Sequence, residues 1–221
     1  NNTIACGAGG DTITTTTGTD TITGGDGADT INSGAAADTI TAGEGADIVL
    51  AGAGGDTVTL TETTSAADNV GILALTDGSA AVAAAGTFSG FDVITGFATT
   101  VDDIVFDSNT NGDDTVDTDI VSGSVIVAAG TAAVTASNDL TTANYTSVDA
   151  VVNYYNDAVN TSAIAAAGNN NDILAVTLGS GTGVMTALYH IVDDSGGIVD
   201  ASEIVLIATA DATLVAGDII A

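Results

Sequence analysis

Residues 24–32 have the sequence GGDGADTIN, and this nine-residue pattern decides the fold of the N-terminal part of the chain. An aspartate recurs at every ninth position, and a β-branched apolar residue follows each aspartate two positions later. The aspartates are Asp11, Asp20, Asp29, Asp38, Asp47 and Asp56, and the apolar residues are Ile13, Ile22, Ile31, Ile40, Val49 and Val58. Asn2 and Ile4 extend the same register by one unit. A fixed short period predicts a solenoid, in which each unit buries its apolar residue against its neighbours.

The length of the repeat predicts a parallel β-roll. Nine residues suffice for a six-residue turn and a three-residue strand, so two repeats make one coil of 18 residues. Strands of successive coils would then stack in two parallel ladders at about 4.8 Å per coil. The glycines before most aspartates fit a turn whose backbone needs positive φ angles or a close approach to a ligand.

The stacked aspartates predict a cation between the turns. Stacked coils place the carboxylates one above another, where like charges repel. The chain has 29 acidic residues, no Lys or Arg, and one histidine, His190, far from the repeats. Carboxylate and carbonyl oxygens are the ligands that Ca²⁺ prefers, so the sequence predicts several bound Ca²⁺ ions and folding coupled to their binding. The alternative is a metal-free solenoid whose aspartates only cap turns.

The repeat resembles the G-G-x-G-x-D-x-U-x pattern of the RTX (repeats-in-toxin) calcium-binding proteins. Residues 24–32 match it in full, and residues 7–11, 43–47 and 52–56 match it in part. The resemblance implies ions between turns two repeats apart, held by aspartate carboxylates and turn carbonyls. The candidate ligands are Gly7, Gly9, Asp11, Asp20, Gly25, Gly27, Asp29, Asp38, Gly43, Gly45, Asp47, Gly52, Gly54 and Asp56, followed by Asp92 and Asp103.

The two edges of the predicted roll differ in their turns. A step of 18 residues places Asp11, Asp29 and Asp47 on a first edge, each after a G-x-G turn. The second edge carries Asn2, Asp20, Asp38 and Asp56, and its turns at residues 15–18 and 33–36 lack that pattern. We therefore expect ions to fill the first edge more completely than the second.

The nine-residue period is lost after residue 60. Residues 70–75 are predicted to form a strand that ends in a hairpin turn at Asp77-Gly78, with residues 80–85 returning. Residues 92–97 and 103–107 are similar to the segment that closes the β-roll in many RTX proteins. They are predicted to be two capping strands that place Phe97 and Phe106 in the core.

Residues 107–113 alternate oxygen donors and have a glycine at the sixth position, as in the first half of an EF-hand loop. This adds Asp107, Asn109, Asn111 and Asp113 to the candidate calcium ligands. The twelfth position is Thr118 instead of Glu, and no flanking helices are predicted, so a solvated acidic turn is the alternative.

The remainder is predicted to be β-rich with one helix. Residues 125–129 form an apolar strand, and residues 172–178, 184–192 and 203–209 suggest a terminal β-meander. A helix is predicted to begin at residues 146–149, with one apolar face made by Val148, Val151, Val152, Tyr155 and Val159. The expected fold is therefore mainly all-β. A parallel β-roll with capping strands spans residues 1–107, and a β-rich C-terminal assembly or secretion region spans residues 108–221.

Composition excludes several classes of function. A formal charge of −29 without any basic side chain excludes ordinary nucleic-acid binding, and no apolar run is long enough for a transmembrane helix. No catalytic motif is present, and His190 lies in an alternating apolar strand where packing is its expected role, so we do not expect an enzyme. Cys6 is interpreted as a small turn residue. The chain begins in mid-repeat without Met, so we expect residues upstream.

The resemblance extends to function. Residues 189–194, 203–207 and 217–221 look like the C-terminal region of RTX surface-layer and secreted proteins, in which a type I secretion channel reads an uncleaved signal. It implies a calcium-dependent, secreted structural protein at the cell surface that self-assembles into an extracellular layer or filament. Its partners would be copies of itself and a cell-surface polysaccharide. The alternative is the C-terminal calcium-folding and secretion module of a larger RTX enzyme or adhesin. A polysaccharide-binding module is a weaker third class, because Trp is absent and four tyrosines form no evident platform.

Overall fold

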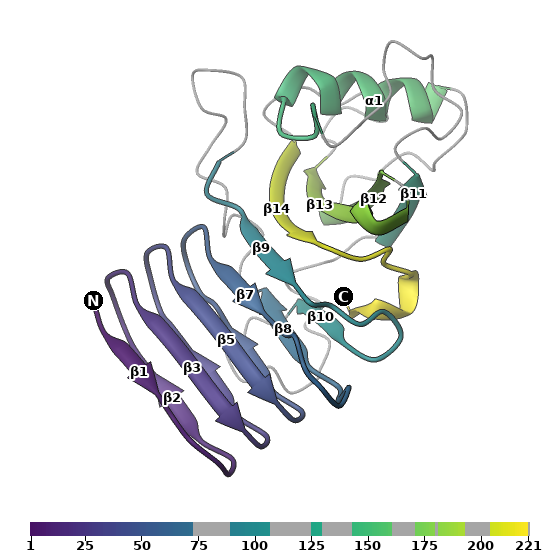
Figure 1. Cartoon of the computed structure of the whole chain (residues 1–221). Coiled ribbons are helices and arrows are strands. Elements are labelled where there is room, and N and C mark those ends of the chain that lie inside the picture. Colours follow the sequence, from purple (N-terminus) through teal and green to yellow (C-terminus); the bar gives the residue numbers. More distant parts are fainter. Residues whose placement is uncertain are drawn as a thin grey trace.

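The computed structural model describes residues 1–72, 89–106, 125–129, 143–160, 171–179, 181–192 and 204–220. It contains a two-sheet β-roll that continues into a curved C-terminal sheet covered by a helix (Figure 1). The predicted hairpin turn at Asp77-Gly78 and the EF-hand-like loop from residue 107 lie outside the described residues.

Two sheets contain the strands. The nine-stranded sheet has the order β1 (Thr3–Ala5), β3 (Thr21–Asp26), β5 (Thr39–Glu44), β7 (Thr57–Thr59), β9 (Asp92–Thr95), β14 (Ile204–Ala210), β13 (Met185–Val192), β12 (Asn171–Leu178) and β11 (Val125–Ala129). The six-stranded sheet has the order β15 (Ile219–Ile220), β10 (Asp103–Phe106), β8 (Asn69–Ile72), β6 (Ile48–Leu50), β4 (Thr30–Asn32) and β2 (Thr12–Thr14).

The repeats form the predicted parallel β-roll. Strands one coil apart pair in parallel with a shift of 18 residues, as in Ile22 with Ile40 and Ile31 with Val49. Because side chains alternate along a strand, the second residue of each strand in the repeats points inward. These residues, among them Ile22, Ile31, Ile40 and Val49, are at most 1% exposed and form one continuous core.

The two predicted capping strands form a further coil. β9 pairs in parallel with β7, and β10 pairs in parallel with β8. Phe97 and Phe106 are buried in the core as predicted, with 7% and 0% of their surface exposed. The two strands do not end the stack, however, because β14 pairs with β9 and β15 pairs with β10. The C-terminal strands therefore take the capping position that residues 92–97 and 103–107 were expected to hold.

The C-terminal segment also holds the last turn of the roll through side chains. Gly96 N and Phe97 N donate hydrogen bonds to the carboxylate of Asp211 at 2.9 and 3.2 Å. The Thr99 hydroxyl and Thr100 N donate to the carboxylate of Asp218 at 2.6 and 2.8 Å. Described residues on the two sides of the expected domain boundary at residue 107 are thus hydrogen-bonded to one another.

The C-terminal elements match the sequence pattern. β12, β13 and β14 form an antiparallel meander, and β11 pairs in parallel with β12. Helix α1 (Val148–Asn160) begins after Ser147, whose hydroxyl accepts a hydrogen bond from Ala150 N at 3.4 Å. Its buried face packs against the meander through Val148, Val151, Tyr154 and Tyr155, with Val152 partly buried. Short 3₁₀ helices η1 (Gly181–Gly183) and η2 (Ala216–Asp218) complete the described elements.

A glycine substitution tests the stacking of the turns. Gly25 has φ +122°, and a Cβ there would lie 2.0 Å from the carbonyl oxygen of Gly7 in the preceding coil. We expect Gly25→Ala to lower the free energy of unfolding of the calcium-loaded protein by at least about 1–3 kcal/mol, because it adds backbone strain and a steric clash. Denaturant unfolding followed by circular dichroism measures this change.

Gly7→Ala is the matched control. Gly7 occupies the same turn position one coil earlier, but a Cβ there meets nothing within 4 Å. Its effect should stay within about 0.5 kcal/mol. Equal destabilisation by both substitutions would contradict the stacking of these two turns.

Candidate metal centre

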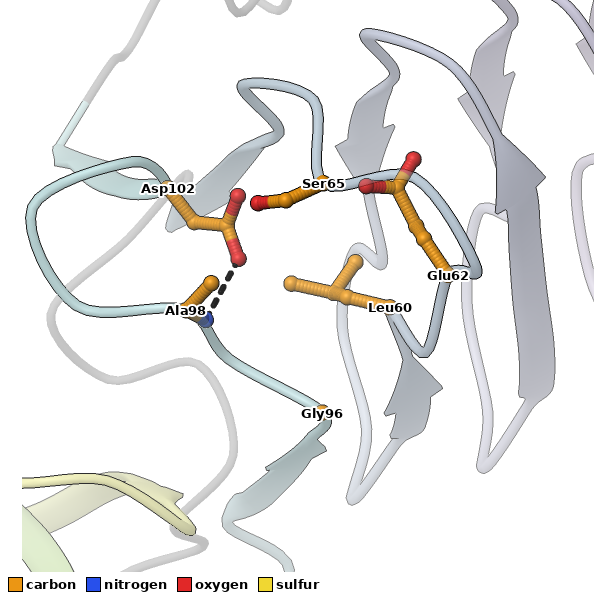
Figure 2. Close-up of a pocket in the computed structure, with 6 residues that line it drawn as sticks. All are labelled: Leu60, Glu62, Ser65, Gly96, Ala98 and Asp102. Carbon is orange, nitrogen blue, oxygen red and sulfur yellow. Dashed lines mark hydrogen bonds between the residues drawn. The ribbon is translucent and has the colours of Figure 1, made fainter.

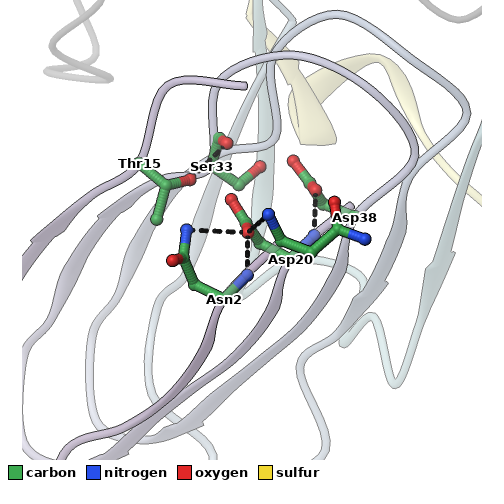
Figure 3. Close-up of polar contacts among 6 residues, drawn as sticks. Asn2, Thr15, Asp20, Ser33 and Asp38 are labelled. Carbon is green, nitrogen blue, oxygen red and sulfur yellow. Dashed lines mark hydrogen bonds and ion pairs between the residues drawn. The ribbon is translucent and has the colours of Figure 1, made fainter. Parts of the chain in front are cut away.

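Aspartates of successive coils are joined in two ladders, one on each edge of the roll. In both ladders the backbone N–H of one aspartate position donates to Oδ1 of the aspartate one coil later. On the first edge the donor–acceptor pairs are Asp11–Asp29 and Asp29–Asp47 at 2.7 Å, Asp47–Asp68 at 2.8 Å and Asp68–Asp102 at 3.1 Å. On the second edge they are Asn2–Asp20 at 2.5 Å and Asp20–Asp38 at 2.7 Å (Figure 3). The same ladder continues with Asp38–Asp56 at 2.7 Å and Asp56–Asp92 at 2.9 Å.

The second carboxylate oxygen of these aspartates is buried and receives no hydrogen bond. This holds for Oδ2 of Asp20, Asp29, Asp38, Asp47 and Asp68. Each of these side chains is at most 2% exposed. The Oδ2 atom of Asp29 lies against its own turn, since a Cβ on Gly24 would be 2.4 Å from it. A buried carboxylate oxygen without a partner is costly, and the chain has no Lys or Arg to neutralise it.

Burial shifts the titration of the first-edge carboxyls. Desolvation raises the pKa of Asp47 to about 6, and Asp29 and Glu62 add like-charge repulsion. Desolvation raises the pKa of Asp68 to about 7, with repulsion from Asp102, Glu62 and Asp47. The pKa of Asp102 is raised for the same leading reason. Without a cation, the folded state therefore disfavours the ionised form of these carboxyls.

The donor set fits a hard cation. No group of three or more His, Cys, Asp or Glu side chains gathers in the described part of the chain, so a cation there would be held by single carboxylates and backbone oxygens. Carbonyl oxygens are at hand because the glycine turns stack closely: a Cβ on Gly43 would lie 1.9 Å from the carbonyl oxygen of Gly25. Ca²⁺ takes six to eight oxygen ligands of these kinds in flexible geometry. On the first edge, Asp29 and Asp47 with the carbonyls of the adjacent glycine turns would hold it.

Four further aspartates show how far the ladders extend beyond the repeats. Asp92, which the sequence suggested as a calcium ligand, lies in the second-edge ladder, where it accepts a hydrogen bond from Asp56 N. Asp103 does not lie in a ladder: it pairs with Asn69 in the sheet, and the ladder position belongs to Asp102. Sequence analysis missed Asp68 and Asp102 because insertions break the 18-residue step. Both residues still stand two positions before a buried apolar residue, Val70 and Ile104, and that signal could have identified them.

The two edges differ in what fills their turns. On the second edge, the hydroxyl of Thr15 donates to the carbonyl oxygen of Ser33 (Figure 3), and the hydroxyl of Ser33 donates to the carbonyl oxygen of Ala51. On the first edge, the glycine at residue 24 leaves no room for such a side chain. The second-edge turn at residues 33–36 still adopts positive φ angles, with Gly34 at 90° and the non-glycine Ala36 at 88°.

A small pocket lies next to the first-edge ladder (Figure 2). Leu60, Glu62, Ser65, Gly96, Ala98 and Asp102 line it. Its carboxylate oxygens are already used, since Asp102 accepts from Ala98 N at 2.7 Å and Glu62 accepts from Gly45 N at 2.8 Å and Ala66 N at 2.6 Å. These hydrogen bonds stabilise the longer turn at residues 60–68. Because they occupy the carboxylate oxygens, we assign no ligand to the pocket.

The two residues with distinctive chemistry lie in structural positions. His190 is buried in β13, as expected from its alternating strand, and burial lowers its pKa to about 4. Cys6 is half-buried in the first turn and packs against the core of the roll. Asp107, Asn109, Asn111 and Asp113 lie outside the described residues.

Comparison with known protein families finds a match for the repeat region. Residues 7–40 and 24–58 match the family model of the RTX calcium-binding nonapeptide repeat (4 copies). Comparison with curated proteins finds no match. None of the described helices is long and apolar enough to cross a membrane. RTX nonapeptide repeats bind calcium, and proteins that carry them are typically secreted. The periodic aspartate ladders and the family match together identify residues 7–58 of this chain as RTX calcium-binding nonapeptide repeats.

Proposed function

We propose that this chain is a calcium-dependent structural protein of the cell exterior that self-assembles into a surface layer or filament. The calcium dependence is supported by the buried aspartate Oδ2 atoms that accept no hydrogen bond, in a chain that has no Lys or Arg. Bound Ca²⁺ supplies the positive charge that these carboxylates lack. Because the ladders join successive coils, binding and folding of the roll are coupled.

Calcium binds more strongly on the first edge in this proposal. Glycine turns bring backbone oxygens close to the next coil on both edges, as Gly25 O near Gly43 and Gly34 O near Gly52 show, so the preference rests on the side chains in the turns. On the second edge, hydroxyl groups already donate to the carbonyl oxygens of Ser33 and Ala51, and a cation would compete with these bonds. Equal occupancy of the two edges would contradict this preference.

Two features of the chain support self-assembly, its negative charge and the edge strands of its two sheets. A chain with formal charge −29 repels its copies, but divalent cations between acidic surfaces remove that repulsion. In this structure β1 and β2 are edge strands of the two sheets, and β11 and β15 are the strands at the opposite edges. Edge strands present unpaired backbone groups to which another chain can add.

A second candidate is a calcium-folded C-terminal module that assists secretion of a larger protein. The observation that favours it is the use of β14 and β15 to extend the roll, which joins the C-terminal region and the repeats in one unit. Such a module needs calcium to fold but does not need to polymerise.

Substitution of one ladder residue tests the calcium site. Asp29→Asn keeps an oxygen that can accept the hydrogen bond from Asp11 N but removes the charge of the buried carboxylate. We expect the calcium concentration at the folding midpoint to rise at least about tenfold, because losing even an outer partner of a metal costs about 10–100-fold in affinity. Circular dichroism during calcium titration of EDTA-treated protein measures the midpoint.

Asp26→Asn is the control for this test, because it removes the same charge from an exposed side chain in the same repeat. Its midpoint should stay close to that of the unaltered chain. A similar shift in both variants would indicate a general charge effect and would count against a site at Asp29.

The raised pKa values predict an unusual pH dependence for the metal-free chain. Asp47 and Asp68 bind protons more tightly when folded, with pKa values of about 6 and about 7, than in the unfolded chain, where an aspartate has a pKa of about 3.9. Their contribution to stability is therefore fully present below about pH 4 and is lost as the pH rises to about 7. In EDTA we expect the thermal midpoint to fall over this range, and saturating calcium should abolish the fall. A metal-free midpoint that rises from pH 4 to 7 would refute this assignment.

Calcium titration with light scattering and electron microscopy separates the two candidate functions. Growth of ordered polymers that coincides with the coil-to-β transition is the outcome expected for a structural protein. A transition to folded monomers without growth would instead support the secretion module. EDTA should dissolve any polymers, because it removes the ions that bridge the acidic surfaces.

A further inference from the structure

One face of the roll is a regular grid of threonines. On β1, β3, β5 and β7 the first outward position is occupied by Thr3, Thr21, Thr39 and Thr57, which pair in register and are all exposed. The second outward position on β3, β5, β7 and β9 is occupied by Thr23, Thr41, Thr59 and Thr95, also in register. We call these two ranks the threonine face; in Figure 1 its strands lie side by side from β1 to β9.

The two ranks of the threonine face carry no charged side chain although the chain has 29 acidic residues. The two ranks are completed by Ala5 and Val93, so no carboxylate stands within them; β3 and β5 continue past the ranks to the paired acidic residues Asp26 and Glu44. The corresponding face of the other sheet is irregular: its first outward rank runs from Thr12 and Thr30 to Ile48, Asn69 and finally Asp103. The inward isoleucines explain the core on both sides, but packing of the core does not require outward threonines.

The grid has fixed spacings. Adjacent strands lie about 4.8 Å apart, and residues i and i+2 on one strand are about 6.7 Å apart. The pairing shows no register shift from β1 to β9. Neighbouring hydroxyls can contact one another, as Thr59 Oγ1 and Thr95 Oγ1 do at 3.2 Å. Each rank thus repeats a methyl and a hydroxyl group along the stack with the period of one coil.

The chemistry of this face selects its ligand. Within the ranks an ionic or basic partner would find no charge, since the carboxylates of Asp26 and Glu44 lie beyond them at the ends of β3 and β5, and a sugar chain would find no aromatic ring on which to stack. The grid covers roughly 19 Å by 7 Å, far less than the about 800 Å² per partner of a standard protein interface. A regular, in-register array of hydroxyls and methyls matches a solid whose surface is itself a periodic network of hydrogen-bonded water.

We infer that the threonine face binds ice. The threonine hydroxyls take the places of water molecules at the crystal surface, and the methyl groups lie in the spaces between them. Each contact is weak, but rigid repetition lets many form at once without further ordering of the protein. This inference does not depend on self-assembly. It requires only a folded roll, so calcium acts on ice binding through folding.

Ice-affinity partition tests the inference with the full chain loaded with calcium. Ice is grown slowly from the solution, and the protein is measured in the ice and liquid fractions beside a reference protein without affinity for ice. We expect enrichment in the ice. Thr39→Tyr places a bulky ring in the middle of the exposed rank and should abolish the enrichment, whereas Thr12→Tyr on the other sheet should retain it.

Circular dichroism establishes that each variant is folded before partition. If Thr39→Tyr does not fold, Thr21→Tyr in the adjacent coil gives the same comparison. Exclusion of the folded, unaltered chain from ice would overturn the inference, and so would equal loss in the Thr12→Tyr and Thr39→Tyr variants. Retention on a crystalline polysaccharide powder together with exclusion from ice would assign the face to carbohydrate instead. None of these outcomes bears on polymer growth, so the proposed structural role is tested independently by the calcium titration.

Discussion

The hydrogen bond from a backbone N–H to the aspartate carboxylate of the next coil is the interaction on which the roll depends. It fixes one oxygen of each carboxylate and holds neighbouring coils in register, as in the bond from Asp29 N to Asp47. The same bond leaves the other oxygen buried without a partner. Stacking and the need for a cation are therefore two consequences of one arrangement. Turns that stack this closely need glycine, since a Cβ on Gly25 or Gly43 would meet the backbone of the preceding coil.

The repeat assigns each position of the nonapeptide to one environment. Asp29 lies on the edge, Thr30 points outward and Ile31 points into the core, and the other coils keep this order. Charge is thereby concentrated along the edges, in the two ladders and at Asp26 and Glu44 where β3 and β5 end, while the two threonine ranks between β1 and β9 carry none. Because neighbouring coils repeat at a fixed distance, a side chain that is unremarkable in one coil becomes part of a periodic surface in the stack.

The C-terminal region belongs to the roll structurally. β14 and β15 continue its two sheets, and the carboxylates of Asp211 and Asp218 accept hydrogen bonds from its last turn. Exposed edges at that end of the solenoid are covered in this way, which natural β-proteins commonly achieve with a following segment. The predicted boundary at residue 107 marks a change in sequence pattern, and the hydrogen-bonded sheets cross it.

The sequence by itself determined the repeat region: the coil length, the inward Ile and Val residues, the two aspartate edges and the need for a cation all follow from the nine-residue period and the lack of Lys and Arg. The helix at Val148 and the meander around β13 also followed from local periodicity. Only the tertiary structure decided that Asp68 and Asp102 join the ladder and that Asp103 does not. It also decided that the C-terminal strands complete the roll. A repeat encodes contacts between neighbouring coils, whereas the pairing of β9 with β14 joins residues more than 100 positions apart, and no local pattern specifies that partner.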